Sequence, residues 1–171
     1  EYRGAAGGAH GQRRYSVCID LDGDDTYRCG NGALGSATYG LGVCIDMAGD
    51  DDYEADKRSA GFAAAGVGVF LDVSGDDKMQ LGAHSGGVGL MGMGHCFDLA
   101  GDDEQRGGRS CFGVGLAGGL GHFVDVSGRD QRYLTGIEGK ANLGFGAARG
   151  FSASRPGGLG VCIDHAGDDT Y

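Results

Sequence analysis

Leu41-Gly-Val-Cys-Ile-Asp-Met-Ala-Gly-Asp-Asp-Asp-Tyr53 is the stretch of sequence that decides the fold of this chain. Its acidic half occurs six times in 171 residues, and the first Asp of successive copies is separated by 26, 26, 26, 27 and 39 residues. The copies begin at Asp20, Asp46, Asp72, Asp98, Asp125 and Asp164. A repeat with a nearly fixed period of this length indicates a stack of similar structural units.

A short run that is typical of a β-strand precedes each acidic copy. Val43-Cys-Ile45 is β-branched and lies between glycines and an acidic turn. The chain has 39 glycines, which disfavour helices, and no segment shows a helical period. We therefore predict an all-β fold, a parallel β-solenoid (β-helix) of six coils with about 26 residues per coil. Residues 1–171 form one domain, and 135–156 is predicted to be a loop inserted within one coil.

Equivalent residues of a solenoid stack as ladders about 4.8 Å apart, so each strand position becomes a column. Successive side chains of a strand point to opposite faces, yet all three residues of most runs are apolar. We expect the middle position to face the core, and the third position is a candidate interface with a partner. The third position holds Ile19, Ile45, Leu71, Phe97, Val124 and Ile163.

The net charge of −10 is concentrated in the repeats, because 20 of the 24 acidic residues fall inside the six acidic copies. Such a stripe repels nucleic acid and attracts cations. The 14 Lys and Arg residues are scattered, mostly in the second half of each repeat. The apolar runs are much shorter than a membrane span. The sequence therefore predicts neither a nucleic-acid partner nor a membrane-spanning segment.

Stacked aspartates repel one another by roughly 1 kcal/mol per neighbouring pair even in water, and a bound cation removes this repulsion. Carboxylates and turn carbonyls are hard oxygen ligands that favour Ca²⁺. Alternatively, Asp side chains cap the amides of their own turns. In the fifth copy, Arg129 replaces an Asp and is expected to neutralise that position internally. The candidate ligands are Asp20, Asp24, Asp25, Asp46, Asp50, Asp51, Asp72, Asp76, Asp77, Asp98, Asp102, Asp103, Asp125, Asp130, Asp164, Asp168 and Asp169.

Gly23-Asp-Asp-Thr-Tyr27 and Gly167-Asp-Asp-Thr-Tyr171 resemble half of the RTX nonapeptide, the calcium-binding β-roll repeat of secreted bacterial proteins. The resemblance implies calcium-dependent folding and an extracellular or cell-surface location. The sequence differs from the family in its repeat length of about 26 residues and in the residues that precede each glycine. Carried over by motif position, the implied calcium ligands are Asp25, Asp51, Asp77, Asp103, Asp130 and Asp169.

Cysteine and histidine offer weaker candidate sites. His95 and His122 would stack and could share a soft metal with Cys96. The column of Cys18, Cys44, Cys96 and Cys162 is expected to hold buried thiols, although the first two are close enough for a disulfide. Cys29 and Cys111 lie off this column and are candidate surface thiols or links between subunits.

The repetition itself argues against an enzyme, because an active site is needed once and interrupts the repeat where it lies. The sequence favours a calcium-stabilised structural protein of the cell surface or of an extracellular fibre, associating with itself end to end or laterally. The given sequence starts and stops at about the same position of the repeat, and no capping segment is visible at either end. The chain is therefore alternatively interpreted as a passive scaffold fragment of a larger protein. Another alternative is a carbohydrate-binding or carbohydrate-active β-helix that uses Glu138, Lys140, Arg149 and Arg155 of the inserted segment.

Overall fold

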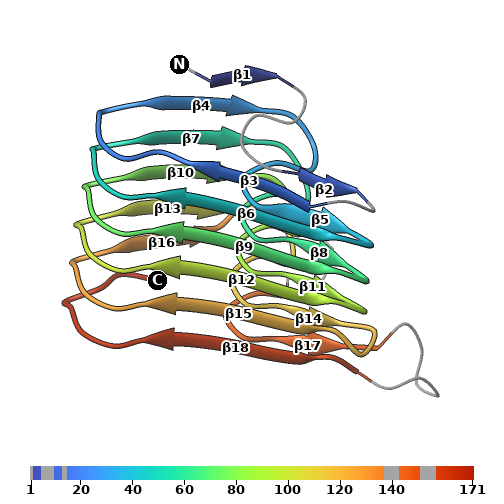
Figure 1. The fold of residues 1–171 in the computed structure, drawn as a ribbon. Coiled ribbons are helices and arrows are strands. Elements are labelled where there is room, and N and C mark those ends of the chain that lie inside the picture. Colours follow the sequence, from blue (N-terminus) through green and yellow to red (C-terminus); the bar gives the residue numbers. More distant parts are fainter. Residues whose placement is uncertain (1, 5–9, 13–14, 137–142, 151–156) are drawn as a thin grey trace.

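The protein is a parallel β-solenoid with three sheets, as a computed structural model shows for residues 2–4, 10–12, 15–136, 143–150 and 157–171 (Figure 1). Each sheet has six strands, and every strand pair is parallel. The predicted fold class is therefore confirmed. The part of the chain described contains no helix of the length and apolarity that a membrane span needs.

We call the three faces of the solenoid sheets A, B and C. Sheet A consists of β1 (Tyr2–Gly4), β4 (Thr26–Cys29), β7 (Asp52–Ala55), β10 (Lys78–Leu81), β13 (Glu104–Gly107) and β16 (Gln131–Leu134). Sheet B consists of β2 (His10–Gln12), β5 (Ser36–Thr38), β8 (Ala63–Ala64), β11 (Gly89–Leu90), β14 (Gly115–Leu116) and β17 (Ala148–Arg149). Sheet C consists of β3 (Tyr15–Ile19), β6 (Leu41–Asp46), β9 (Val67–Asp72), β12 (Met93–Asp98), β15 (Leu120–Asp125) and β18 (Leu159–Asp164).

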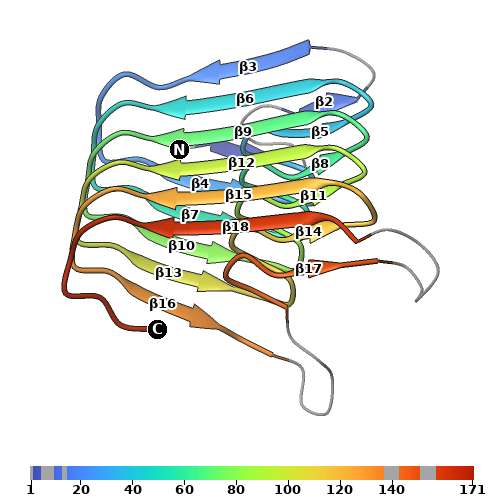
Figure 2. The same cartoon turned by 90° about the horizontal axis from the view of Figure 1, so that it is seen from below.

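Each coil runs from sheet C through the acidic turn to sheet A, then to sheet B and back. The acidic turns stack along one edge of the solenoid (Figure 2). Asp46 pairs with Asp72 and Tyr27 pairs with Tyr53, so the register follows the 26-residue repeat of the sequence. Equivalent residues of successive coils consequently form the columns that the repeat predicts.

Glycine is required in the acidic turn because adjacent coils meet there through their backbones. A Cβ atom on Gly75 would lie 1.7 Å from the carbonyl oxygen of Gly49, and Gly75 has φ +153°. A Cβ atom on Gly49 would lie 2.1 Å from the carbonyl oxygen of Gly23. Any larger residue would separate the coils, which explains why the glycine recurs in phase with the aspartates.

The middle residue of each sheet C triplet faces the core, as predicted. Cys44, Phe70, Cys96 and Phe123 are all buried, whereas the residues on either side are partly exposed. The rings of Phe70 and Tyr53 meet edge to face at 5.2 Å between centroids, which links sheet C to sheet A.

The cysteines pack as thiols in the part of the chain described, where no disulfide joins them. The Cys18 thiol instead shares a hydrogen bond with Cys44, which lowers its pKa to about 7. Cys29 and Cys111 are buried in the core cluster, so the prediction of surface thiols at these positions is wrong. Cys29 is the last residue of β4, and Cys111 lies between β13 and β14.

The segment 135–156 contains the sheet B strand β17, which pairs with β14. Gly144 also forms a β-bridge with Cys111. The two parts of this segment at 137–142 and 151–156, with Glu138, Lys140 and Arg155, lie outside the described residues.

Candidate functional site

The aspartates of the acidic turns form three columns, of which two face the core. The strand-end column lies at the ends of the sheet C strands and comprises Asp20, Asp46, Asp72, Asp98, Asp125 and Asp164. The inner turn column precedes the sheet A strands and comprises Asp25, Asp51, Asp77, Asp103, Asp130 and Asp169. Eight of these residues are buried, namely Asp46, Asp51, Asp72, Asp77, Asp98, Asp103, Asp125 and Asp130. The outer column faces solvent and comprises Asp24, Asp50, Asp76, Asp102, Arg129 and Asp168.

The inner turn column and the outer column both cap backbone amides of neighbouring coils. The Asp51 amide donates to the Asp77 carboxylate at 2.7 Å, and the Asp77 amide donates to the Asp103 carboxylate at 2.7 Å. In the outer column the direction is reversed, since the Asp76 amide donates to the Asp50 carboxylate at 2.9 Å. These aspartates therefore cap turn amides, but the capped amides belong to the neighbouring coil and not to their own turn, as the sequence alternative had it.

Arg129 supplies a positive charge within the outer column. Its guanidinium group contacts the Asp102 carboxylate at 2.7 Å, and both side chains are exposed. This ion pair agrees with the expectation that Arg129 neutralises its position from within the chain. The pair lowers the pKa of Asp102, which receives hydrogen bonds from the Arg129 side chain and amide.

A fourth inward column supplies hydrogen-bond donors to the buried carboxylates. It contains the second residue of β4, β7, β10, β13 and β16 and the equivalent Tyr171, in the order Tyr27, Tyr53, Met79, Gln105, Arg132 and Tyr171. The Tyr53 hydroxyl lies 2.7 Å from an Asp72 oxygen and 3.0 Å from an Asp46 oxygen, so it can donate to either. The Gln105 amide donates to Asp98 at 2.6 Å. Met79 offers no such donor.

Arg132 is the buried cation of the core. Its side chain is fully buried and forms ion pairs with Asp125, with Asp130 at 3.0 Å and with Asp164 at 2.6 Å. The sequence analysis missed it because it occupies the Tyr position of the repeat. An alignment of the six copies at the Tyr position would have shown a single arginine seven residues after the first Asp of its copy.

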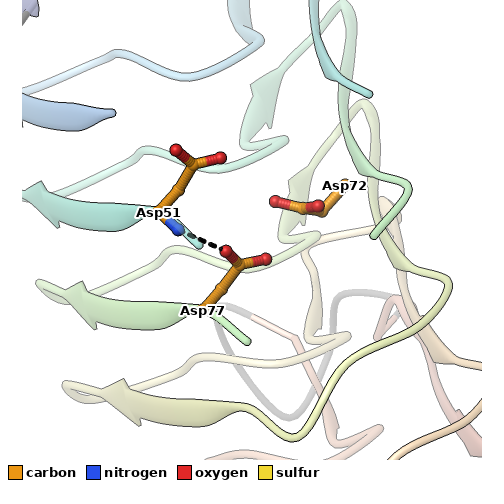
Figure 3. A group of neighbouring side chains, drawn as sticks. All are labelled: Asp51, Asp72 and Asp77. Carbon is orange, nitrogen blue, oxygen red and sulfur yellow. Dashed lines mark hydrogen bonds between the residues drawn. The ribbon is translucent and has the colours of Figure 1, made fainter. Parts of the chain in front are cut away.

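Two groups of three buried carboxylates have the arrangement of a cation site. Asp51, Asp72 and Asp77 form the first group (Figure 3), in which one oxygen of each lies within 4.8 Å of the others. The second group, with the same spacing, consists of Asp98, Asp103 and Asp125. The remaining predicted ligands do not join a group of three among the described residues.

Each group contains buried carboxylate oxygens without a hydrogen-bond partner. In the first group this atom is Oδ2 of Asp77, whose coil carries Met79 where its neighbours carry tyrosine or glutamine. In the second group the atoms are Oδ2 of Asp103 and Oδ1 of Asp125. A buried polar atom without a partner costs about 1–3 kcal/mol, and more when it is charged. These oxygens therefore require a proton, a cation or a donor.

Burial raises the pKa of these carboxyl groups far above the ordinary value of 3.8. The pKa rises to about 7 for Asp51, Asp103 and Asp125, with burial as the largest cause. It rises to about 9 for Asp77, where the charge of Asp72 adds to the effect of burial. At neutral pH the two groups consequently hold protons unless a cation replaces them.

The donor set has the chemistry of a site for a hard cation. Carboxylate oxygens are hard ligands, and calcium binds them at about 2.3–2.6 Å. One oxygen of each residue lies within 4.8 Å of the others, so all three can reach one cation placed between them. Thiol and imidazole ligands are absent from both groups.

The histidine pair lies outside these groups, on the outer face of sheet C. Nδ1 of His95 and Nδ1 of His122 are 3.4 Å apart. Cys96 points to the opposite side of its strand and is buried in the core. The predicted soft-metal site shared with Cys96 is therefore wrong, because side chains of adjacent strand residues face opposite ways.

Comparisons of the chain with protein-family models, curated proteins and solved structures give no match. The structure has a parallel β-solenoid and acidic clusters, which are features that RTX-like repeats would have. Membership of that family stays a prediction.

Proposed function

We propose that the chain is a calcium-stabilised structural β-solenoid that functions at the cell surface or in an extracellular fibre and associates with itself. The observation that carries this proposal is the imbalance in the core, where among the described residues eight buried carboxyl groups face one buried cation, Arg132. An uncompensated buried charge is strongly destabilising, so these groups must hold protons or share a cation. Calcium in the two carboxylate groups would remove this cost and connect neighbouring coils.

The proposed role is structural and non-enzymatic. The carboxylate groups are buried in the solenoid, and the same turn recurs in every coil. A cation bound there would supply positive charge to Asp77 and Asp103, whose free oxygens have no donor. Calcium at millimolar concentration, which suits weak sites, is typical of extracellular modules. This supports a location outside the cell.

Calorimetric titration with Ca²⁺ and thermal unfolding in EGTA test the calcium role. We expect binding to raise the melting temperature by many degrees and EGTA to reverse the change. The double substitution Asp77→Asn and Asp103→Asn keeps the capping oxygens but removes two ligand charges, so calcium binding should be lost. Asp76→Asn is the matched control in the exposed outer column and should bind calcium like the wild type. A melting temperature that is indifferent to both EGTA and Ca²⁺ would refute the calcium role.

The outer face of sheet C is the surface proposed for lateral association. We call it the apolar face; it comprises Tyr15, Val17, Ile19, Leu41, Val43, Ile45, Val67, Val69, Leu71, Met93, His95, Phe97, Leu120, His122, Val124, Leu159, Val161 and Ile163. These positions carry no Asp, Glu, Lys or Arg, although the chain has a net charge of −10. Face-to-face contact between two copies would keep their acidic turns apart.

The size of the apolar face suits a second copy of the chain. Six strands at about 4.8 Å and six residues at about 3.3 Å give about 600 Å² per copy. The total of about 1,200 Å² reaches the lower end of the range for specific protein interfaces. Two such sheets would pack about 10 Å apart, as in a β-sandwich.

Sedimentation velocity over a range of protein concentrations tests the association. We expect the wild type to form dimers, and Leu71→Lys together with Phe97→Lys to abolish them. Gln80→Lys and Arg106→Lys, which change exposed positions of sheet A, are the controls and should leave dimerisation intact. Rods that grow with concentration and are insensitive to the sheet C substitutions would indicate end-to-end association. A wild type that stays monomeric at every concentration would contradict self-association.

A further inference from the structure

A row of basic side chains crosses four coils of this acidic protein. Arg58 and His84 lie in the loops after β7 and β10, Arg109 lies in the loop after β13, and Arg149 is in β17. Backbone hydrogen bonds join these loops, because the Arg58 amide donates to Ala83 at 3.0 Å and the His84 amide donates to Arg109 at 2.9 Å. Loops that are far apart in sequence thus stack side by side.

The row lines a cavity between sheets A and B. The cavity has a volume of about 360 Å³, and its walls include Arg58, His84, Arg109 and Arg149 together with the apolar Leu90. A second cavity of about 650 Å³ shares the first three of these residues and adds Lys57 and Asn31. We call the two cavities together the basic groove.

The bases of the groove lack acidic partners within the described part of the chain. Exposed arginines elsewhere do have them, since Arg28 pairs with Glu54 and Arg106 pairs with Glu104. By contrast, Lys57, Arg58, Arg109 and Arg149 form no ion pair with a described residue. In a chain with 24 acidic and 14 basic residues, this is an unusual separation of charge.

His84 lies among these bases and lines both cavities. Its Nδ1 atom is buried and has no hydrogen-bond partner among the described residues. The pKa of His84 is lowered by burial and then by the charges of Arg109, Arg58 and Lys57. The neutral form of the imidazole is therefore favoured, and the arginines are the charged groups that an anion would meet.

We infer that the basic groove binds an acidic oligosaccharide, whose carboxylate or sulfate groups pair with the arginines and whose hydroxyl groups contact the walls of the cavity. Arg58, Arg109 and Arg149 come from three coils and line one cavity, so an extended polyanion could pair with all three and relieve their mutual repulsion. Leu90 and Leu116 provide an apolar wall for the face of a sugar ring.

A sugar fits this groove better than a nucleic acid does. Nucleic-acid sites without sequence preference stack bases on exposed aromatic rings, and among the described residues the one aromatic that lines the groove, Phe62, is buried. A long phosphate backbone would also meet the acidic turns of a protein with a net charge of −10. A short acidic saccharide would stay within the groove.

Calorimetry with a galacturonic acid tetrasaccharide at low ionic strength tests the inference, with a neutral galactose tetrasaccharide as the control ligand. We expect only the acidic sugar to bind, and added salt to weaken it. Arg58→Gln combined with Arg109→Gln should weaken binding at least about 100-fold, since each charge-assisted hydrogen bond contributes about tenfold or more. Arg28→Gln combined with Arg106→Gln removes the same charge outside the groove and should change affinity less than about twofold.

Circular dichroism and the melting temperature establish that every variant is folded under the titration conditions. This readout separates the inference from the calcium proposal, because a calcium-independent but folded protein can still bind the sugar. The inference is overturned if folded wild type binds no acidic sugar, or if both pairs of substitutions weaken binding equally. It is also overturned if a single-stranded oligonucleotide of equal charge binds more tightly to the groove.

Discussion

The calcium-free protein should become less stable as the pH rises from about 4 to about 9. Asp51, Asp103 and Asp125 have an ordinary pKa of 3.8 that rises to about 7 in the folded chain, and that of Asp77 rises to about 9. Between the ordinary and the raised pKa, the folded chain binds more protons than the unfolded chain. Stability is therefore complete below about pH 4 and is lost as the pH rises through the raised values.

The expected change is large compared with the total stability of a domain. Each pKa unit corresponds to 1.36 kcal/mol, so one carboxyl group shifted from 3.8 to about 7 loses about 4 kcal/mol of stability across that interval. Seven buried carboxyl groups have a raised pKa and titrate together, and we expect a total loss of at least about 4 kcal/mol. Domains are typically stable by only 5–15 kcal/mol, so EGTA-treated protein should be partly or wholly unfolded at pH 9.

Urea unfolding at pH 5, 7 and 9, in EGTA and in millimolar Ca²⁺, measures this change. Calcium binds deprotonated carboxylates, so it should raise the free energy of unfolding strongly at pH 9 and weakly at pH 5. Asp77→Asn removes a group that titrates and should flatten the profile in EGTA, whereas Asp76→Asn in the outer column should leave it unchanged. Equal stability of the EGTA-treated wild type at pH 5 and pH 9 would refute the protonation of the inner columns. Equal stabilisation by calcium at both pH values would refute its binding to these carboxylates.

Two further substitutions change the donors of the buried carboxylates. Met79→Tyr places a hydroxyl group between coils as Tyr53 does, so in EGTA at pH 8 it should raise the urea midpoint and reduce the response to calcium. Arg132→Met removes the buried cation beside Asp125. It should lower the free energy of unfolding, measured by urea titration, by about 3–5 kcal/mol at pH 8 and by less at pH 5. An unchanged midpoint for Met79→Tyr, or an equal loss at both pH values for Arg132→Met, would count against the reasoning.

The solenoid was predictable because its determinants are local and repeated. Three features are visible in the sequence. The period of 26 residues sets the length of the coil, and the glycine before each Asp pair sets the turn. The alternation around Cys44 and Phe70 sets the core column. The direction of the aspartates was not predictable in the same way. It depends on the path of the turn, which brings Asp72 and Asp77 to one side of the backbone and Asp76 to the other.

The basic groove was beyond prediction for a different reason. Arg58 and His84 share one position of the repeat, but Arg109 and Arg149 occupy two others, so in the sequence these bases look scattered. Only the stacking of loops and the return of the chain through β17 bring them to one cavity. The sequence alternative of a carbohydrate site near Arg149 named one of these residues and missed the other three.

Both candidate sites follow from the parallel stack, which brings residues of successive coils about 4.8 Å apart. Inside the solenoid the repeated charge is a carboxylate, and among the described residues only Arg132 opposes it as a buried cation. Between sheets A and B the stack gathers bases from different positions of the repeat, and no described acid pairs with them. In both places one counterion would relieve the repulsion between several neighbours at once. A chain of this design would therefore be stabilised by a small cation at the acidic turns and by an extended anion at the groove, and it could lose either ligand without losing the other.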